Sequence, residues 1–338
     1  MKIRGIARGR QVARRITSVF QRKTIVLLYH RVAALVSDPQ LLSVTPQHFA
    51  EHLDVLRKYY RPVSLKDSER RVQRAVVITF DDGYADNLWN AKPLLERYEV
   101  PATVFITTGY IGRQREFWWD ELERLLLDGE RLPKTVCLKI NGGIRRWELG
   151  TGDMSHHTDQ TWNLLAKSDP SPRQSLYRSL HQLLRPMREI EQRQVLDDLV
   201  QFTGTGHTPR PSYRALTPDE VIRLAEGRLV EVGAHSVTHP VLATLAVDAQ
   251  YAEVQESKAD LEKILGRPIP SFAYPYGSIS DYTQATVAAV RQAGYVRACA
   301  NFPGPVEPKS DRFQLPRFLV RDCDGDRFAR QLREWFQS

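Results

Sequence analysis

The sequence is poor in cysteine and contains no long uninterrupted apolar run. Its three cysteines, Cys137, Cys299 and Cys323, are far apart and form no Cys-x-x-Cys pair. This spacing supports neither a disulfide framework nor a cysteine zinc site. No stretch of about 18 apolar residues could span a bilayer, and the N-terminus lacks the apolar core and small-residue cleavage site of a secretory signal. These absences predict a cytoplasmic protein.

Acidic residues are absent from positions 1–23, which hold eight basic residues. The rest of the chain carries 40 of the 48 basic residues and all 40 acidic ones, so the net charge of +8 comes from this arm. A neutral body argues against a nucleic-acid groove in the folded part. We expect the basic arm to be solvated, or to form an amphipathic helix on an anionic membrane surface. A transit peptide is a further alternative.

The length of 338 residues exceeds that of an ordinary domain, but an α/β barrel of about 200 to 250 residues counts as one domain. Apolar β-branched runs alternate with helical patterns, which is typical of a parallel sheet. Seven runs favour a closed or nearly closed barrel over an open sheet. The predicted strands are 24–29, 75–80, 102–107, 229–234, 271–274, 295–298 and 317–321.

The alternation stops between residues 113 and 212, where helical patterns follow one another and Asn141-Gly142-Gly143 signals a hairpin turn. We therefore expect a mainly helical insertion at 113–212, within a barrel made of 24–112 and 213–338. The helices predicted in the barrel are 46–59, 88–98, 217–226, 248–265, 282–293 and 327–336, and those in the insertion begin near 117, 174 and 190.

The run 75–80 ends in two carboxylates and a glycine, Asp81, Asp82 and Gly83. Such a run is typical of a strand that is buried on both faces. Neighbouring side chains on a strand point in opposite directions, so the two acids can serve one site only if the backbone turns, which Gly83 permits. The alternative is an ordinary turn whose aspartate caps the next helix.

Two histidines four positions apart, His235 and His239, directly follow the strand predicted at 229–234. This spacing lets two imidazoles reach one metal ion, and Asp82 follows a strand that opens on the same face of the barrel. Two imidazoles and one carboxylate leave a divalent metal with open positions. With Asp82 as a ligand, Asp81 is free to accept a proton from water.

Three segments together resemble motifs of the NodB-homology polysaccharide deacetylases, which form carbohydrate esterase family 4. They are Thr79-Phe80-Asp81-Asp82-Gly83, His235-Ser236-Val237-Thr238-His239 and Phe272-Ala273-Tyr274-Pro275-Tyr276-Gly277. The resemblance covers about residues 24–112 and 213–325. It implies a distorted (β/α)7 barrel, in agreement with the seven predicted strands.

The resemblance also implies roles for these residues. Asp81 would be the base, and Asp82, His235 and His239 would hold a divalent metal. Zinc is the first choice for that metal, with cobalt, nickel or manganese as alternatives. Pro275 and Tyr276 would line the substrate groove, and the Tyr276 backbone N–H would donate to the oxyanion.

The chain departs from the family pattern at two positions. Ala273 occupies the place of an arginine that steadies the base, and Leu315-Pro316-Arg317 replaces a Leu-x-His whose histidine is the acid. The segment Leu28-Tyr29-His30-Arg31-Val32 resembles that of a circularly permuted branch, in which the acid follows an N-terminal strand. We therefore expect His30 to be the acid, with a strand-capping role as the alternative. Arg317 could steady Asp81, or could form an ordinary surface ion pair.

The insertion opens with Phe117-Trp118-Trp119-Asp120, of which Trp119 and Asp120 are candidates for the substrate groove. Aromatic faces suit sugar rings and a carboxylate can bind hydroxyl groups, although core packing explains the tryptophans equally well. We expect a metal-dependent hydrolase that removes N-acetyl groups from an amino sugar in an oligosaccharide, a polysaccharide or a lipid-linked glycan precursor. The alternatives are a hydrolase of a non-sugar amide and an inactive glycan-binding protein.

Overall fold

The computed structural model describes residues 23–70, 72–128, 132–150, 161–204, 206 and 208–338. The prediction for the basic arm therefore lies outside the described residues, except for Lys23. Among the described helices, none combines the length and the apolar character that a membrane span requires. The described cysteines, Cys137, Cys299 and Cys323, are all free thiols.

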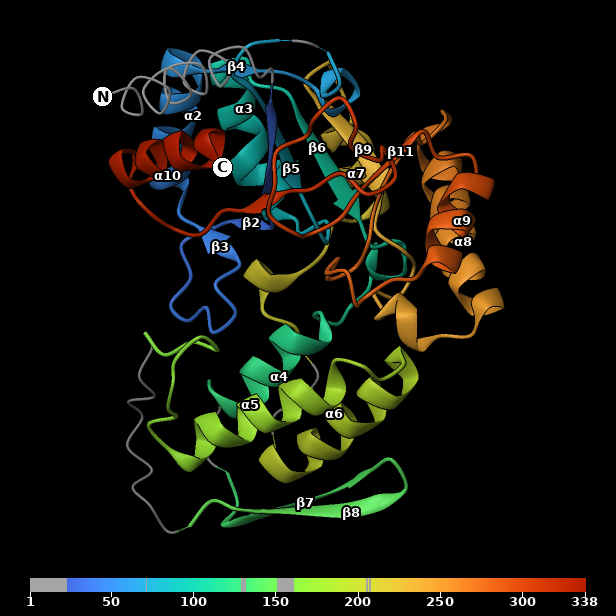
Figure 1. Cartoon of the computed structure of the whole chain (residues 1–338). Coiled ribbons are helices and arrows are strands. Elements are labelled where there is room, and N and C mark those ends of the chain that lie inside the picture. Colours follow the sequence, from blue (N-terminus) through green and yellow to red (C-terminus); the bar gives the residue numbers. More distant parts are fainter. Residues whose placement is uncertain (1–22, 71, 129–131, 151–160, 205, 207) are drawn as a thin grey trace, which may run out of the picture.

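Seven parallel strands curl into a half-barrel of the (β/α)7 type, in the order β11-β10-β9-β6-β5-β1-β12 (Figure 1). A short eighth strand, β4, pairs with the start of β5. The strands of this sheet are β1 (Thr24–Tyr29), β4 (Arg61–Pro62), β5 (Ala75–Phe80), β6 (Ala102–Ile106), β9 (Val230–Ala234), β10 (Ser271–Ala273), β11 (Arg297–Cys299) and β12 (Phe318–Leu319). A separate two-stranded sheet consists of β2 (Arg31–Val32) and β3 (Ser43–Val44).

Every residue of β1 and β5 is buried, because both faces of these central strands are covered. Their parallel register pairs Thr24 with Ala75 and Tyr29 with Phe80. The next residues along the two strands, His30 and Asp81, therefore leave the sheet side by side. The register thus brings two separate chain segments to the same carboxyl edge.

The two ends of the sheet approach each other through the segment that precedes β12. Cys299 forms an isolated parallel bridge with Leu315, and the Arg317 backbone N–H donates to the Phe302 carbonyl at 3.1 Å. The predicted strand 317–321 is wrong in length, since only Phe318–Leu319 pair with β1. The strand predicted at 295–298 begins later, at Arg297, after the helix-ending turn at Gly294.

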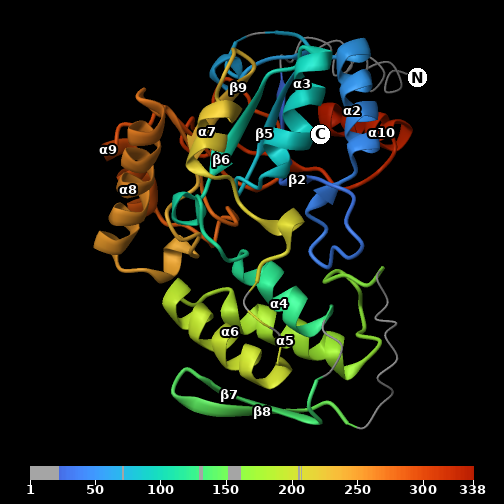
Figure 2. The ribbon, with the colours of Figure 1, turned by 180° about the vertical axis from the view of Figure 1, so that it is seen from behind.

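Helices α2, α3 and α10 lie to one side of the sheet, and α8 and α9 lie to the other (Figures 1 and 2). Thr45 caps α2, and Thr217 with Glu220 forms the predicted capping box at the start of α7. The helices are α2 (Pro46–Tyr59), α3 (Lys92–Tyr98), α7 (Pro218–Leu224), α8 (Val247–Leu265), α9 (Gln284–Gln292) and α10 (Gly325–Gln337), with 3-10 turns at Leu65–Asp67, Thr108–Tyr110, Pro211–Tyr213 and Leu242–Thr244.

The helix predicted at 88–98 is instead divided into two parts. A π-turn at Asn87–Ala91 precedes α3, in which Pro93 occupies the first turn and lacks a backbone N–H. The first turn of a helix tolerates a proline, whereas a proline in the interior of a helix removes a backbone hydrogen bond. The interruption therefore follows from a residue within the predicted helix.

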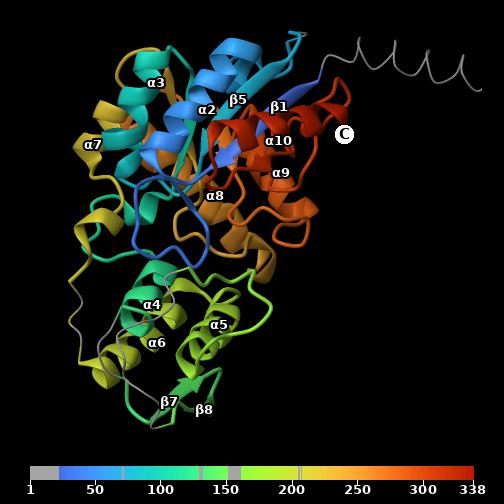
Figure 3. The same cartoon turned by 90° about the vertical axis from the view of Figure 1, so that its left-hand side faces the viewer.

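The described part of residues 113–212 includes three helices and a hairpin, which lie below the carboxyl ends of the strands in Figures 1 and 3. Asn141 and Gly142 both have positive φ, as the hairpin turn requires. Apolar residues of these elements form a second core, which Tyr84 and Tyr110 of the barrel join. The elements are α4 (Trp118–Leu126), β7 (Thr135–Ile140), β8 (Gly143–Glu148), α5 (Pro172–Leu184) and α6 (Glu189–Thr203).

Candidate active site

The candidate residues converge at the carboxyl ends of β1, β5 and β9, on the side that faces the insertion (Figure 1). The Asp81 backbone N–H donates to the Tyr29 carbonyl, and the His235 N–H donates to the Ile106 carbonyl. Each of these bonds extends a strand pair by one residue. Regular sheet register therefore delivers the acids and the first histidine to one place, and their side chains are buried.

The backbone around the site adopts left-handed conformations that non-glycine residues rarely occupy. The φ angles are +74° at Asp82, +61° at Ser236, +60° at His239 and +58° at Tyr276. Each such residue costs about 1–3 kcal/mol unless its surroundings hold it in place. Strain of this kind gathers at functional sites.

Asp82, His235 and His239 present one ligand atom each, and these atoms all lie within 4.8 Å of one another. Nε2 of His239 is 3.3 Å from Asp82 Oδ1, and Nε2 of His235 is 3.6 Å from the same oxygen. His235 Nδ1 lies 2.8 Å from the Ala273 carbonyl, so this nitrogen carries the proton and the Nε2 lone pair is free. The donor set and its protonation fit a divalent metal ion.

The loop that carries the two histidines is anchored by Glu253 of α8. One Glu253 oxygen accepts the backbone N–H groups of Val237 and Thr238, and the other accepts the Thr238 hydroxyl. Gly109 packs so close to this loop that a Cβ there would lie 2.6 Å from the Val237 carbonyl oxygen. The positions of the histidines are therefore set by tertiary contacts as well as by β9.

Asp81 is held by Arg317 in a bidentate ion pair, with both N–O distances 2.7 Å. Arg317 is itself fully buried, and its Nε donates to the Ala300 carbonyl at 2.8 Å. Burial acts to raise the pKa of Asp81, but Arg317 and His235 outweigh it, so that the pKa lies below its ordinary value. Asp81 is therefore an ionised carboxylate, 3.8 Å from His235 Nε2.

The ionisation states of Asp82 and His235 suit metal binding. Burial acts to raise the pKa of Asp82, yet its hydrogen bond with His239 and the nearby His30 and His235 lower it to about 2. Burial lowers the pKa of His235 to about 4, because the charged imidazolium would lose its hydration. A carboxylate and a neutral imidazole are the forms that bind a cation.

His30 follows β1 and is partly buried. Its carbonyl accepts a hydrogen bond from Asn87 Nδ2 at 2.9 Å, which fixes the backbone at this position. Its Nδ1 is buried and has no hydrogen-bond partner among the described residues. Nδ1 is therefore not committed to a structural hydrogen bond, and His30 is near enough to help lower the pKa of both Asp81 and Asp82.

The backbone and the ring of Tyr276 have different contacts. No described residue accepts a hydrogen bond from its N–H, whereas its carbonyl accepts one from Asn301 Nδ2 at 3.0 Å. Its ring packs edge-to-face against His239, with centroids 4.6 Å apart, and its hydroxyl accepts from Trp118 Nε1 at 3.3 Å. Pro275 is buried beside it.

Trp119 and Asp120 are both buried, so neither presents an open surface. Trp119 packs edge-to-face against His239, with ring centroids 4.8 Å apart. The Tyr84 hydroxyl accepts from Trp119 Nε1 at 2.8 Å and donates to Asp120 Oδ2 at 2.6 Å. Sequence reasoning missed Tyr84, although its place two residues after Asp82 was a signal.

Arg185, which follows α5, was also missed. Its guanidinium lies 4.3 Å from the centroid of the Tyr276 ring, and its NH2 is 2.6 Å from Asp281 Oδ1. These contacts join the insertion to the barrel beside the site. Nothing in the sequence near Arg185 indicates this position, because both partners come from distant segments.

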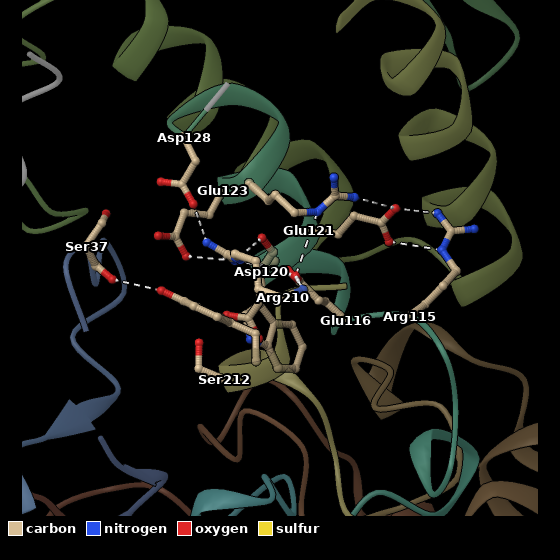
Figure 4. A network of polar contacts seen from close by, with 12 residues as sticks. Ser37, Arg115, Glu116, Asp120, Glu121, Glu123, Asp128, Arg210 and Ser212 are labelled. Atoms are coloured by element: carbon tan, nitrogen blue, oxygen red, sulfur yellow. Dashed lines mark hydrogen bonds and ion pairs between the residues drawn. The ribbon is translucent and has the colours of Figure 1, made fainter. Parts of the chain in front are cut away.

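Asp120 also belongs to a buried network of charges along α4, drawn in Figure 4. Arg210 donates to both oxygens of Glu116 and to the Asp120 carbonyl, while its guanidinium lies 3.6 Å from Glu123 Oε2. Burial raises the pKa of Asp120 to about 7 and that of Glu123 to about 8, although Arg31 and Arg210 respectively oppose the shift.

Comparison with known families gives an independent result. The sequence matches the family model for polysaccharide deacetylase at residues 68–133 and 197–298. Over 130 residues it is 28% identical to YxkH of Bacillus subtilis (strain 168), whose description as a polysaccharide deacetylase is provisional. That match covers 36% of this chain and 45% of YxkH, so it spans less than half of the curated relative.

Solved structures share the fold. IcaB from Ammonifex degensii is 19% identical with a TM-score of 0.55, over 94% of this chain and 98% of that one. The deacetylase PplD of Streptococcus pyogenes, solved in complex with acetate, is 16% identical with a TM-score of 0.53, over 94% of this chain and 100% of that one. At these identities the likeness concerns the fold.

Proposed function

We propose that this chain, which belongs to the polysaccharide deacetylase family, is a metal-dependent hydrolase that removes N-acetyl groups from an amino sugar in an oligosaccharide, polysaccharide or lipid-linked glycan precursor. The observation that carries the proposal is the ionised Asp81, paired with Arg317 and next to the three candidate ligands. An ionised carboxylate beside a metal site suits the hydrolysis of an amide.

Asp82, His235 and His239 would hold the metal, which when bound supplies a Lewis acid that activates water and polarises a carbonyl. Zinc matches two imidazoles and a carboxylate, with cobalt, nickel or manganese as alternatives. Residues within hydrogen-bonding reach of the bound substrate must then supply the proton transfers.

Asp81 accepts a proton from the attacking water while the water oxygen bonds to the acetyl carbon. Arg317 keeps Asp81 ionised and fixes the direction of its oxygens, which is the role that Ala273 cannot fill. This positioning requires a bidentate guanidinium, and a lysine at this place would provide only one point of attachment.

The Tyr276 backbone N–H donates to the negative oxygen that develops on the acetyl carbon. His30 protonates the departing nitrogen, so that the C–N bond breaks to give acetate and a free amine on the sugar. The free His30 Nδ1 supports this role, because a histidine that already donates within the fold is less able to exchange its proton.

The test is the release of acetate from a panel of N-acetylated oligosaccharides, polysaccharides and lipid-linked sugars, with zinc, cobalt, nickel or manganese added. We expect metal-dependent release of acetate and an equal amount of free amine. Release from non-sugar amides alone would indicate the first alternative. Glycan binding without release from any compound, with metal bound, would contradict the proposal and favour an inactive binding protein.

The proposal also includes the cellular setting. Cytoplasmic placement, with the basic arm on an anionic membrane surface, would suit a lipid-linked precursor. The neutral charge of the rest of the chain supports no role for nucleic acid. Release of the protein from anionic vesicles by removal of residues 1–23 would support the membrane contact.

A further inference from the structure

We infer that Trp119 and Tyr84 are positioning residues for His239, so that the insertion is part of the metal site rather than a neighbour of it. The inference rests on the metal site of the proposed function. It concerns the two histidine ligands, which are held in different ways by the rest of the chain.

His235 has the usual support of a metal-binding histidine. Its Nδ1 donates to the Ala273 carbonyl at 2.8 Å, which fixes both the tautomer and the orientation of the ring. His239 has no such bond, since its Nδ1 is buried and has no hydrogen-bond partner among the described residues. The contact of His239 Nε2 with Asp82, 3.3 Å long, would give way to the metal, so contacts other than a hydrogen bond from Nδ1 must orient the ring.

Within the described part of the chain, three rings surround His239 edge-to-face. The ring centroids of Trp119, Tyr276 and His235 lie 4.8, 4.6 and 4.9 Å from its own, with interplanar angles of 62°, 74° and 66°. Such contacts stabilise a ring in a preferred direction. Of the three neighbours, only Trp119 comes from the insertion.

Trp119 is fixed in turn from the barrel. Its Nε1 donates to the Tyr84 hydroxyl at 2.8 Å, and that hydroxyl donates to Asp120 at 2.6 Å. The Tyr84 ring is fully buried, with the Arg31 guanidinium 4.3 Å from its centroid. Tyr84 thus joins the strand end that carries Asp82 to the helix that carries Trp119.

The backbone of His239 makes this support necessary. Its φ of +60° is unfavourable for a histidine, and such a conformation persists only where the surroundings hold it. Its N–H donates to Ser236 Oγ at 3.1 Å, which anchors the main chain but not the ring. Loss of Trp119 would leave the ring free to turn away from Asp82.

The test measures the metal affinity of the full chain by competition with a chelator, together with the absorption spectrum of the cobalt form. We expect Trp119→Ala to lower the affinity about 10–100-fold, as loss of a supporting partner does at other metal sites. Tyr84→Phe keeps the ring but removes both hydrogen bonds, and should lower the affinity by a smaller factor. Trp119→Phe should restore part of the affinity that Trp119→Ala loses, and the cobalt spectrum should shift in the weakened variants.

The matched control is Trp147→Ala, which removes an indole of the insertion whose Nε1 donates to Ser179 rather than to the site. It should bind metal as the wild type does. Circular dichroism and melting of the metal-free forms identify variants that fail to fold. If Trp119→Ala fails to fold, the metal affinity of Tyr84→Phe tests the inference.

Wild-type affinity and an unchanged cobalt spectrum in folded Trp119→Ala and Tyr84→Phe would overturn the inference, as would a wild type that binds no divalent metal. A wild type that binds metal but releases no acetate would contradict the proposed function alone. The two failures are therefore distinguishable.

Discussion

Asp81 in the barrel and Glu123 in the insertion are both buried carboxylates beside an arginine, yet their pKa values shift in opposite directions. For both groups burial is the largest effect and acts to raise the pKa. Asp81 has two N–O contacts of 2.7 Å to Arg317, whereas the Arg210 guanidinium lies 3.6 Å from Glu123 Oε2.

The difference shows that the geometry of an arginine decides whether a buried acid stays charged. Two short hydrogen bonds compensate Asp81 for its lost hydration, whereas Arg210 makes its short bonds to Glu116 instead. Glu123 Oε1 has no partner among the described residues. The barrel therefore keeps a carboxylate ready for chemistry, and the insertion keeps a carboxyl group that gains a proton near neutral pH.

Arg317→Met should have the largest effect, because it removes both short hydrogen bonds to Asp81. It leaves Asp81 buried without its partner, which should lower the free energy of unfolding by about 3–5 kcal/mol. Acetate release should fall about 100-fold or more, since Asp81 would no longer be held as an oriented base. Urea unfolding and the acetate assay check the two effects.

Arg312→Met is the matched control, because Arg312 pairs with Glu69 at the surface, where both side chains are substantially exposed. It should change neither measurement appreciably. Equal losses in the two variants would show that the burial of Arg317–Asp81 has no special importance.

A divalent metal bound at the barrel site should stabilise the folded chain. A divalent metal at about 100 times its Kd should stabilise the folded chain by about 2.7 kcal/mol, since the unfolded chain lacks the assembled site. His235→Ala should lose this gain. His48→Ala should keep it, because His48 pairs with Asp322 at the surface, away from the site. Thermal melting with and without metal measures the effect, and an identical gain in His235→Ala would disprove the assigned ligand.

Glu123 of the insertion should make the free energy of unfolding depend on pH. The folded-state pKa of Glu123, about 8, lies above its ordinary value of 4.5, so the folded chain holds a proton that the unfolded chain has released. This contribution to stability is present below about pH 4.5 and is lost as pH rises toward 8, by up to about 1.4 kcal/mol per pH unit.

Glu123→Gln removes this proton from the folded chain. Between pH 6 and pH 8, the free energy of unfolding of the wild type should fall by about 1–3 kcal/mol relative to that of the variant. Urea unfolding at both pH values checks this, and Glu96→Gln on α3, whose side chain is half exposed, is the control. Parallel pH profiles for wild type and Glu123→Gln would show that Glu123 is ionised in the fold.

The smallest effect is expected for an exposed pair in the insertion. Arg146 and Glu148 lie 2.5 Å apart on β8, with both side chains largely in solvent. Glu148→Gln should leave the midpoint of urea unfolding unchanged, because water and salt screen such a pair. A marked loss would mean that exposure is not what separates weak pairs from Arg317–Asp81.

Much of this fold was predictable because its strands are buried on both faces and stand out as apolar β-branched runs. The capping box at Thr217 and the turn at Asn141 are local signals, and the structure contains both. The π-turn before α3 was not predicted, although Pro93 is a local signal for an interrupted helix. The short β12 was not predicted, because its length depends on pairing with the distant β1.

The site shows the same division. The proximity of Asp82, His235 and His239 could be predicted from the sequence, because each follows a predicted parallel strand or lies within one turn of it. The contact of Arg317 with Asp81 was one of two alternatives, and the bidentate geometry became visible only in three dimensions. The place of Tyr84 two residues after Asp82 was a signal, but its hydroxyl partners could not be predicted, because they come from α4.

Asp81 and Asp82 should have separate roles in one site, the first as base and the second as metal ligand. Metal content and acetate release, measured in the same samples of Asp81→Asn and Asp82→Asn, decide whether they do. Asp81→Asn should retain metal while its acetate release falls about 100-fold or more, whereas Asp82→Asn should lose both. Full acetate release by Asp81→Asn, or full metal binding by Asp82→Asn, would contradict these separate roles.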